Sequence, residues 1–428
     1  MKPAHVLVGF GFGPIQAGLF VKEAYESGAF RRIAVAEINP ELVRAVRENN
    51  GCYSVNVAYL DRIEAHEIRG VELLNPLVSE DREQLLEALA EATEIVTALP
   101  SINFYDSGGR RQSVASMVAD GLKRNASGKT IIYTAENHNH AAEIFADAVA
   151  RYGGPSGGER VQYLNTVIGK MSRVVEEASE IERLHLRPIA PGITRAFLVE
   201  SFNRILVTRV SISDFMPGIR VFEEKDDLLP FEEVKLYGHN AIHVLLGFLA
   251  DFRGYRRMCE LRDDSRIMTI GRNAFLDESG NALIRRYACV GDSLFTPEGF
   301  RIYAEDLLER MTNPYLSDTI ERICRDPIRK LGYNDRLFGA MRLTMEYGIT
   351  PVNLALGACA GVIFLLKQSE RYSIPESLRV KFPAEAEQID VDGILSWIWG
   401  RAASQRINND AVVQLVKQQM SRLLRENF

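Results

Sequence analysis

Residues 5–18 read HVLVGFGFGPIQAG, and this stretch decides the fold class of the first part of the chain. Its opening residues are apolar and rich in valine, which is typical of a buried β-strand. Gly11 and Gly13 follow at once, and apolar residues at helical spacing continue to Tyr25. A strand, a glycine loop and a helix in this order let the backbone approach a phosphate group at the helix N-terminus. A simple tight turn would give the same pattern, so the loop alone decides nothing about a ligand.

An acidic residue strengthens the case for a dinucleotide. Residues 33–36 (IAVA) form a second strand-like run that ends at Glu37, 24 residues after Gly13. A carboxylate at this position binds the ribose hydroxyls of a dinucleotide and repels the 2′-phosphate of NADP. Because no arginine follows directly, the sequence predicts NAD as the cofactor. Gln16 stands where a third glycine is common, and we count it with Gly11, Gly13 and Glu37 as a predicted cofactor contact.

Apolar runs and amphipathic segments alternate through the first half of the chain. Residues 95–99 and 130–133 are the clearest further strands, and helical patterns lie between them. Apolar strands that alternate with helices predict a parallel sheet covered on both faces. We therefore predict a doubly wound α/β domain over residues 1–225.

The second half has a different character, with long helical patterns and few strand signals. We predict a mostly α-helical domain over residues 226–428, in which about 372–428 form an additional helical segment. A β-hairpin is expected around residues 277–280 (DESG), where turn-forming residues cluster. The clearest helical patterns cover residues 234–252, 296–311, 340–366 and 391–424.

The composition excludes several classes of protein. The 428 residues carry 51 lysines and arginines against 57 aspartates and glutamates, a formal net charge of −6 that gives no general attraction to nucleic acid or anionic membranes. The five cysteines are scattered, which disfavours disulfides and a structural zinc site. The longest apolar run, residues 354–366, is shorter than the roughly 18–20 residues of a membrane helix. We expect a soluble, cytoplasmic protein that acts on a small molecule, and the sequence leaves a monomer and a homodimer open.

Residues 234–243 (VKLYGHNAIH) combine three polar groups at the start of an otherwise apolar helix. On an α-helix at about 100° per residue, Asn240 lies about 140° and His243 about 80° around from Lys235. Most lysines are solvated surface charges, and most single histidines simply bond to their neighbours. Three such groups on one side of an apolar helix favour a catalytic site instead.

The spacing Lys-x(4)-Asn-x(2)-His resembles the signature of the polyol-specific long-chain dehydrogenases, the mannitol dehydrogenase family. Further segments resemble that family in the same order along the chain, and together the similarity covers about residues 5–366. The resemblance implies a Rossmann-like, NAD-binding first domain followed by a mostly helical one. The segments are Gly11-x-Gly13 with residues 36–39 (AEIN), then 135–137 (AEN), 164–167 (LNTV), 199–202 (VESF), 313–318 (NPYLSD) and 325–331 (RDPIRKL).

The resemblance also implies roles for individual residues. Lys235 is the expected general base, because a lysine in a partly desolvated cleft has its pKa lowered toward the working pH. Asn240 and Asn165 are expected to donate hydrogen bonds to the substrate oxygen, and His243 to hold the hydroxyl or orient the lysine. Asn137 is an expected cofactor contact. No metal is needed, because the lysine takes the role that zinc plays in other alcohol dehydrogenases.

A dense group of basic residues raises the question of a phosphate. Arginine forks suit bidentate phosphate binding, although ordinary helix-surface charges paired with nearby acids would look the same. Resemblance to the sugar-phosphate branch of the family favours phosphate contact by Arg325, Arg329 and Lys330. The whole group comprises Arg322, Arg325, Arg329, Lys330 and Arg336.

The expected activity is therefore the NAD-dependent interconversion of a hexitol phosphate and a ketose phosphate, such as mannitol 1-phosphate and fructose 6-phosphate. Two alternatives remain open, namely a polyol or hexuronate dehydrogenase with an unphosphorylated substrate and a catalytically silent NAD-binding protein. Gly169 and Lys170 stand where related enzymes carry an Asp-Arg pair, and Thr208 stands where an acid is frequent. These departures leave the identity of the substrate open.

Overall fold

The computed structural model describes residues 4–110, 112–125, 128–316, 318–400 and 410–425. The chain divides into two compact units, Met1–Leu229 and Pro230–Phe428. The division lies four residues beyond the boundary predicted from the sequence.

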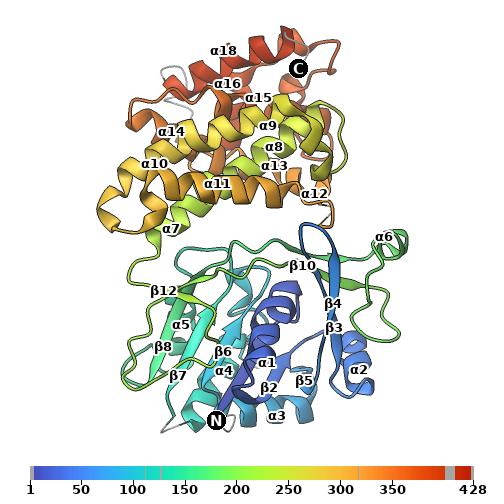
Figure 1. The fold of residues 1–428 in the computed structure, drawn as a ribbon, viewed down its shortest axis with the longest axis vertical. Helices are drawn as coiled ribbons and strands as arrows, with labels where there is room; N and C mark the ends of the chain where they lie inside the picture. Colours follow the sequence, from blue (N-terminus) through green and yellow to red (C-terminus); the bar gives the residue numbers. More distant parts are fainter. Residues whose placement is uncertain (1–3, 111, 126–127, 317, 401–409, 426–428) are drawn as a thin grey trace. The chain divides into compact units, whose positions relative to one another are not determined.

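The main sheet of the first unit has eight strands in the order β12-β11-β8-β7-β6-β1-β2-β5. The six strands from β8 to β5 run parallel, whereas β11 runs antiparallel to β8. This order reverses beside β1, as in dinucleotide-binding folds, and it confirms the predicted doubly wound sheet (Figure 1). The strands are β1 (His5–Phe10), β2 (Phe30–Ala36), β5 (Val71–Leu74), β6 (Glu94–Thr97), β7 (Thr130–Thr134), β8 (Val161–Val167), β11 (Leu206–Thr208) and β12 (Glu223–Lys225).

Both faces of this sheet are covered. On one face, α3 (Ser79–Ala90), α4 (Val114–Arg124) and α5 (Ala141–Arg151) bury a core that includes Val8 and Ile95. The other face is covered by η1 (Gln16–Val21), α1 (Lys22–Ser27) and α2 (Pro40–Glu48). The start of α2 is set locally, because the side chain of Asn39 accepts hydrogen bonds from the backbone N–H groups of Glu41 and Leu42.

A second, four-stranded sheet packs against η1, and its strand pairing was not predicted from the sequence. Its order is β4-β3-β10-β9, with β3 and β10 parallel and both outer strands antiparallel. A Cβ atom on Gly18 would lie 2.6 Å from Cγ1 of Val199, so the glycine allows η1 to lie directly on this sheet. The strands are β3 (Tyr53–Ala58), β4 (Ile63–Ile68), β9 (Ser172–Val175) and β10 (Ala196–Glu200), and a short helix α6 (Ala178–Arg183) follows β9.

In the second unit, α8 (Ala241–Phe252) and α15 (Val352–Lys367) pack together at the centre. A Cβ atom on Gly357 would lie 2.6 Å from the Leu245 side chain, and one on Gly361 would lie 2.8 Å from Phe248, so small residues permit this contact. The other main helices are α7 (Leu229–Glu233), α9 (Ser265–Asn273), α10 (Asn281–Arg286), α11 (Pro297–Met311), α12 (Ile320–Cys324), α13 (Pro327–Lys330), α14 (Arg336–Glu346), α16 (Val391–Trp399) and α18 (Ala411–Arg425).

The prediction of a β-hairpin at residues 277–280 is wrong. These residues belong to η5 (Ala274–Gly280), a π-helical segment between α9 and α10. Gly280 is buried, and a Cβ atom there would lie 2.4 Å from the carbonyl oxygen of Phe275 and 2.5 Å from the Phe300 ring. The glycine is required by close packing inside a helix, whereas the sequence pattern was typical of a turn.

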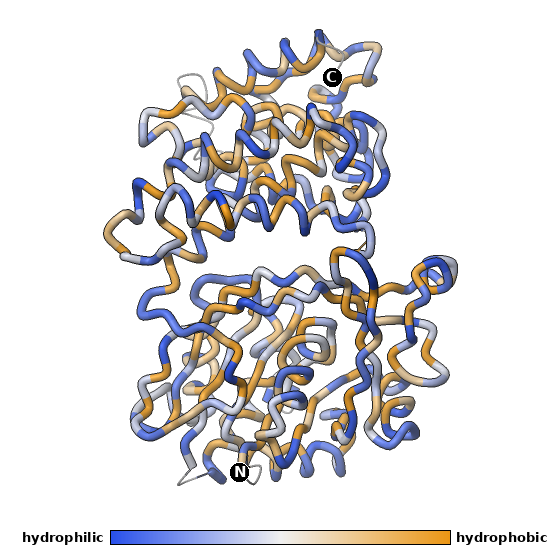
Figure 2. Tube along the Cα trace, in the orientation of Figure 1, coloured by the Kyte–Doolittle hydropathy of each residue, from blue (hydrophilic) through white to orange (hydrophobic). Residues whose placement is uncertain are grey.

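The C-terminal helices extend the core of the second unit. Helix α18 packs on α15 through buried side chains such as Val413 and Val416, and hydrophilic and hydrophobic colours alternate along it in Figure 2. Helix α16 ends at Trp399, whose Nε1 donates to the carbonyl oxygen of Leu331 over 2.8 Å. Among the described helices, none is long and apolar enough to span a membrane.

Candidate functional site

The glycine loop begins at the carboxyl end of β1. Gly11 has φ +83°, and a Cβ atom there would lie 2.7 Å from the carbonyl oxygen of Ala98, just after β6. Its backbone N–H donates to the carbonyl oxygen of Ala36 at the end of β2. A Cβ atom on Gly13 would meet nothing within 4 Å, so open space lies beside the loop. The loop therefore lies where the strand order reverses, which is the usual ligand position in such sheets.

Glu37 lies beside this loop and is bound to it. Its two carboxylate oxygens accept hydrogen bonds from the backbone N–H groups of Phe12, at 3.0 Å, and Asn39, at 2.7 Å. The side chain remains partly exposed. The loop and the carboxylate that the sequence associated with a dinucleotide are thus adjacent in the fold, and their arrangement fits a phosphate on one side and ribose hydroxyls on the other.

Gln16 does not fit its predicted role as a cofactor contact. It is completely buried in η1, and a Cβ atom on Gly9 would lie 2.2 Å from its Nε2. Within the described chain, neither polar atom of its side-chain amide has a hydrogen-bond partner. The side chain points into the packing between η1 and Gly9 of β1.

The turn after β7 contains a buried residue, Glu136, followed by an exposed one, Asn137. Glu136 is buried and accepts hydrogen bonds from Thr97 Oγ1 at 2.9 Å, the backbone N–H of Leu99 at 2.8 Å and the hydroxyl of Tyr105. Burial raises the pKa of this carboxyl group above its usual value. Glu136 therefore ties the end of β7 to the end of β6, and it leaves the neighbouring Asn137 exposed at the same edge of the sheet.

Asn165 on β8 is occupied at the start of α5. Its Oδ1 accepts a hydrogen bond from the backbone N–H of Ala142 at 2.9 Å, and its Nδ2 donates to the carboxylate of Glu143 at 2.9 Å. The oxygen is thus used in capping the helix, so the contribution of Asn165 to an oxyanion site is limited to its amide nitrogen.

The departures at Gly169 and Lys170 have a structural explanation. Lys170 is buried, and its amine donates to the carbonyl oxygen of Phe202 at 2.8 Å and to Oδ1 of Asn203 at 2.6 Å. The lysine therefore holds the chain that follows β10. Thr208 contributes a long contact, 3.5 Å, from its hydroxyl to the carbonyl oxygen of Asn165.

Lys235 and Asn240 lie in a π-helical segment of the second unit, η3 (Val234–Asn240), which continues into α8. The placement expected from the sequence assumed an α-helix, in which Lys235 and Asn240 lie about 140° apart around the axis. A π-helix bonds residue i to i+5, so residues five apart lie nearly above one another. The structure therefore brings Lys235 and Asn240 closer to one face than the sequence predicted, and π segments are frequent at functional sites.

Lys235 has an unusual acidity. Desolvation lowers the pKa of its amine to about 8; the nearby Glu232 opposes this change and the positive charge of Arg336 adds to it. A lysine with this pKa is present in both protonation states near neutral pH, which is the condition for a general acid and base.

His243 lies one turn further along, on α8. Its Nε2 is buried and has no hydrogen-bond partner in the described chain. Burial lowers the pKa of the His243 ring to about 4, although the neighbouring Asp318 acts in the opposite direction. Its ring centroid is 6.0 Å from that of His239, which is buried and also has a lowered pKa through burial. His243 is therefore neutral at neutral pH, with one polar atom left for a ligand.

The predicted phosphate trio is not gathered into one site. Arg325 is exposed, and so is Arg329, whose Nε donates to Asp326 Oδ2 at 2.6 Å. Lys330 is buried, and its amine donates to the carbonyl oxygens of Ile323, at 2.6 Å, and Arg325. The amine of Lys330 thus stabilises the turn between α12 and α13, and Arg329 forms surface ion pairs with Asp326 and Asp335, as the structural alternative predicted.

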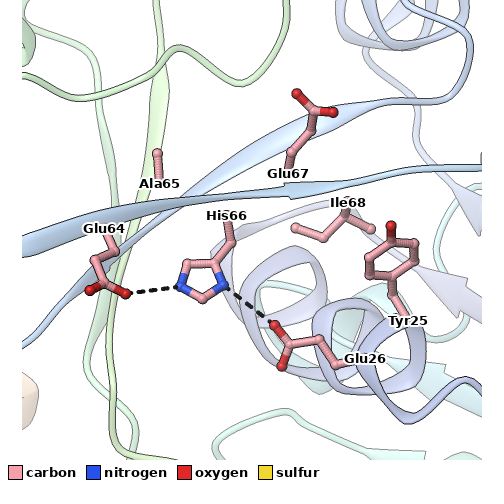
Figure 3. A pocket seen from close by; sticks show the side chains of 7 residues that line it. All are labelled: Tyr25, Glu26, Glu64, Ala65, His66, Glu67 and Ile68. Carbon is pink, nitrogen blue, oxygen red and sulfur yellow. Dashed lines mark ion pairs between the residues drawn. The ribbon is translucent and has the colours of Figure 1, made fainter.

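A cavity of about 430 Å³ in the first unit lies away from the glycine loop. Figure 3 shows His66 of β4 between two carboxylates, with Nδ1 3.4 Å from Glu26 and Nε2 3.8 Å from Glu64. Glu26 and Tyr25 belong to the last part of α1, whereas the loop precedes η1. Among the described residues, no group of three or more His, Cys, Asp or Glu could hold a metal ion, here or elsewhere.

A family model and the curated relatives of this chain point to the same family of dehydrogenases. Residues 227–424 match the model of the mannitol dehydrogenase C-terminal domain. The chain is 27% identical to a mannitol-1-phosphate 5-dehydrogenase of Thermoanaerobacter pseudethanolicus, over 98% of both chains. It is also 27% identical to the enzyme of that name from Lactiplantibacillus plantarum, over 80% of this chain and 82% of the relative.

Two solved structures share the fold of the whole chain. A D-sorbitol dehydrogenase in substrate-free form superimposes with a TM-score of 0.74 at 16% identity, covering 100% of this chain and 94% of the other. A mannitol 2-dehydrogenase of Pseudomonas fluorescens, in a ternary complex with NAD and D-mannitol, gives a TM-score of 0.67 at 16% identity, covering 98% and 96%. At this identity the similarity establishes the fold alone.

Proposed function

Because the chain belongs to the mannitol dehydrogenase family, we propose that it is an NAD-dependent oxidoreductase that interconverts a hexitol phosphate and a ketose phosphate, of the mannitol 1-phosphate and fructose 6-phosphate type. The observation that carries the proposal is the arrangement of Lys235, Asn240 and His243 on η3 and α8. Two curated relatives that cover 91% and 98% of this chain are named as mannitol-1-phosphate 5-dehydrogenases, which supports the phosphorylated substrate.

The residues of the glycine loop fit NAD. Gly11 and Gly13 let the backbone approach the pyrophosphate, and Glu37 accepts the hydrogen bonds of the adenosine ribose hydroxyls. The same carboxylate disfavours NADP, because it would face the 2′-phosphate at close range. When bound, NAD accepts the hydride from the alcohol carbon or, as NADH, returns it to the ketone.

In this mechanism Lys235 moves the proton. During alcohol oxidation its neutral amine takes the hydroxyl proton, and during ketone reduction its ammonium group protonates the oxygen. Asn240, on the same face of η3, donates a hydrogen bond to that oxygen, and neutral His243 binds the hydroxyl through Nε2. A pKa of about 8 gives Lys235 both forms in one enzyme at physiological pH.

A dehydrogenase for an unphosphorylated polyol or a hexuronate would use the same three residues. A silent NAD-binding protein would have no use for a lysine whose pKa is lowered to about 8 beside a histidine with an unpartnered buried nitrogen. We therefore favour an enzyme over a binding module.

The test follows NADH consumption by the purified chain with fructose 6-phosphate in one reaction and fructose in the other. Turnover with the phosphate alone is the expected result. Turnover with fructose alone would leave the assignment of Lys235 as the base unchanged, but it would show that the substrate is not phosphorylated. Absence of turnover with both, while NADH still binds, would contradict the proposal and direct the search to hexuronates.

A further inference from the structure

A buried arginine at the start of α14 has unused hydrogen-bonding capacity. The Arg336 side chain is 9% exposed, and its Nε donates to Oδ1 of Asp335 at 2.7 Å. Within the described chain, Asp335 is the only hydrogen-bonding partner of this guanidinium. A guanidinium carries five N–H donors in a planar fork, and the contact with Asp335 uses the one on Nε. The two terminal nitrogens of Arg336 are therefore available to an anion that enters this region.

The position of Arg336 connects it with the catalytic residues. Helix α14 packs on η3, and a Cβ atom on Gly339, one turn after Arg336, would lie 2.5 Å from Cε1 of Tyr237. Tyr237 belongs to the same π-helical segment as Lys235 and Asn240. The first turn of α14 therefore lies directly beside the segment that carries the proposed base.

The charge of Arg336 acts on this same group of residues. It contributes to lowering the pKa of Lys235, of His243 and of Lys330. Asp335, the nearest acid, is shared with the Nη1 of Arg329 at 3.8 Å. Arg329 also pairs with Asp326 at 2.6 Å, so Asp335 serves mainly Arg336, and the nearby Lys235 and Lys330 add positive charge that suits an anionic ligand.

We propose that Arg336, oriented by Asp335, is the residue that binds the phosphate group of the substrate. The proposal rests on the proposed function and deepens it, because it assigns substrate specificity to one side chain. In fructose 6-phosphate the phosphate lies at the opposite end of the carbon chain from the carbonyl group. A fork on the helix next to η3 can hold that end while Lys235 acts at the other, and a bidentate pair of hydrogen bonds fixes its direction.

The experiment compares the whole chain with the variants Arg336→Met and Arg336→Lys. Steady-state turnover is measured with fructose 6-phosphate, and calorimetry measures the binding of inorganic phosphate to the NADH-loaded protein. Arg336→Met is expected to raise the KM for fructose 6-phosphate about 10- to 100-fold and to abolish phosphate binding, since a hydrogen-bonded charge pair is lost. Arg336→Lys is expected to recover part of both, because it restores the charge and not the fork.

Two further variants separate this role from a structural one. Arg301→Met removes an exposed arginine of α11 that pairs with Glu298 and Glu305, and it is the matched control for loss of charge. Arg329→Met tests the exposed arginine that the sequence favoured. NADH affinity and the thermal midpoint of each variant are measured alongside, so that a misfolded protein is recognised.

The outcomes distinguish the inference from the proposed function. If Arg336→Met keeps the wild-type KM and phosphate affinity, or if Arg329→Met carries the loss instead, the assignment of Arg336 is overturned. If the wild-type chain binds phosphate but does not reduce fructose 6-phosphate, the proposed function is wrong, and phosphate binding by the variants still decides the role of Arg336. A wild-type chain that binds no phosphate overturns the assignment as well.

Discussion

The two units of this protein build their sites in opposite ways. In the first unit, the glycine loop and Glu37 follow consecutive strands, and the parallel sheet places their carboxyl ends side by side. In the second unit, Lys235 and His243 come from one helical segment, whereas Asp318 and Arg336 come from segments that lie about 80 to 100 residues further along the chain. A site of the first kind can be read from local spacing, and one of the second kind depends on how helices pack.

The substitution Lys235→Met should have the largest effect in the second unit. Removal of a general acid and base reduces the rate about 10²- to 10⁴-fold, so kcat should fall within this range in both directions. Because the glycine loop and Glu37 belong to the other unit, NADH affinity should be unchanged. Stopped-flow single-turnover measurements and NADH fluorescence titration check both expectations. A near-normal kcat would show that another group moves the proton.

The corresponding substitution in the first unit, Glu37→Gln, should act on coenzyme affinity. Loss of the charged acceptor is expected to weaken NADH binding about 10- to 100-fold, and it should weaken NADPH binding less, because the repulsion of the 2′-phosphate is also removed. The control is Glu41→Gln, which removes an exposed charge in the first turn of α2. Equal losses for NADH and NADPH would mean that Glu37 merely supports the loop.

The pH dependence should separate the two units again. With a pKa of about 8 for Lys235, the kcat for alcohol oxidation should rise about tenfold per pH unit below pH 8 and level off above it. The kcat for ketone reduction should show the reverse, since the ammonium form is lost as pH rises through 8. NADH affinity should remain level over the same range. A flat kcat profile in single-turnover experiments would contradict the role of Lys235.

The sequence predicts those parts of the two sites that depend on residues close together in the chain, and it misses those that depend on distant residues. The loop and Glu37 depend on neighbours in sequence, and the structure places them at adjacent strand ends as expected. The Asn39 cap of α2 is an equally local interaction. The π-helical geometry at Lys235 had no signal in an apolar helical pattern. Long-range packing also decides which basic side chains can bind a ligand. In this structure the amine of Lys330 donates to backbone carbonyl oxygens instead.

Arg336 illustrates the same limit. In the sequence it looks like any surface arginine beside an aspartate. Only the packing of α14 on η3 shows that its side chain is buried. Gly280 is a second case, because its resemblance to a turn glycine hid a packing requirement. The second sheet likewise depends on the pairing of β3 with β10, two strands more than 100 residues apart, which no local pattern encodes.

A smaller effect is expected in the second unit from the contact between α16 and the segment that joins Lys330 to Arg336. Trp399→Phe removes the hydrogen bond to Leu331 and should lower the free energy of unfolding by about 1 kcal/mol. It should also raise the KM for the sugar phosphate a few-fold, without changing NADH affinity. The control is Trp397→Phe, and the readouts are urea unfolding and steady-state kinetics. Equal effects of the two variants would mean that this hydrogen bond does not position the segment.

The last prediction concerns the residue of the first unit where local spacing misled. Gln16→Met replaces a buried amide that has no partner in the described chain by an apolar side chain of similar size. Since an unpaired buried polar group costs about 1–3 kcal/mol, the variant should be more stable by about 1 kcal/mol, with unchanged NADH affinity. Exposed Gln84→Met is the control and should stay within about 0.5 kcal/mol of the wild type. A variant with weakened NADH binding would instead mean that the amide turns toward the coenzyme, as its position in the glycine loop predicted.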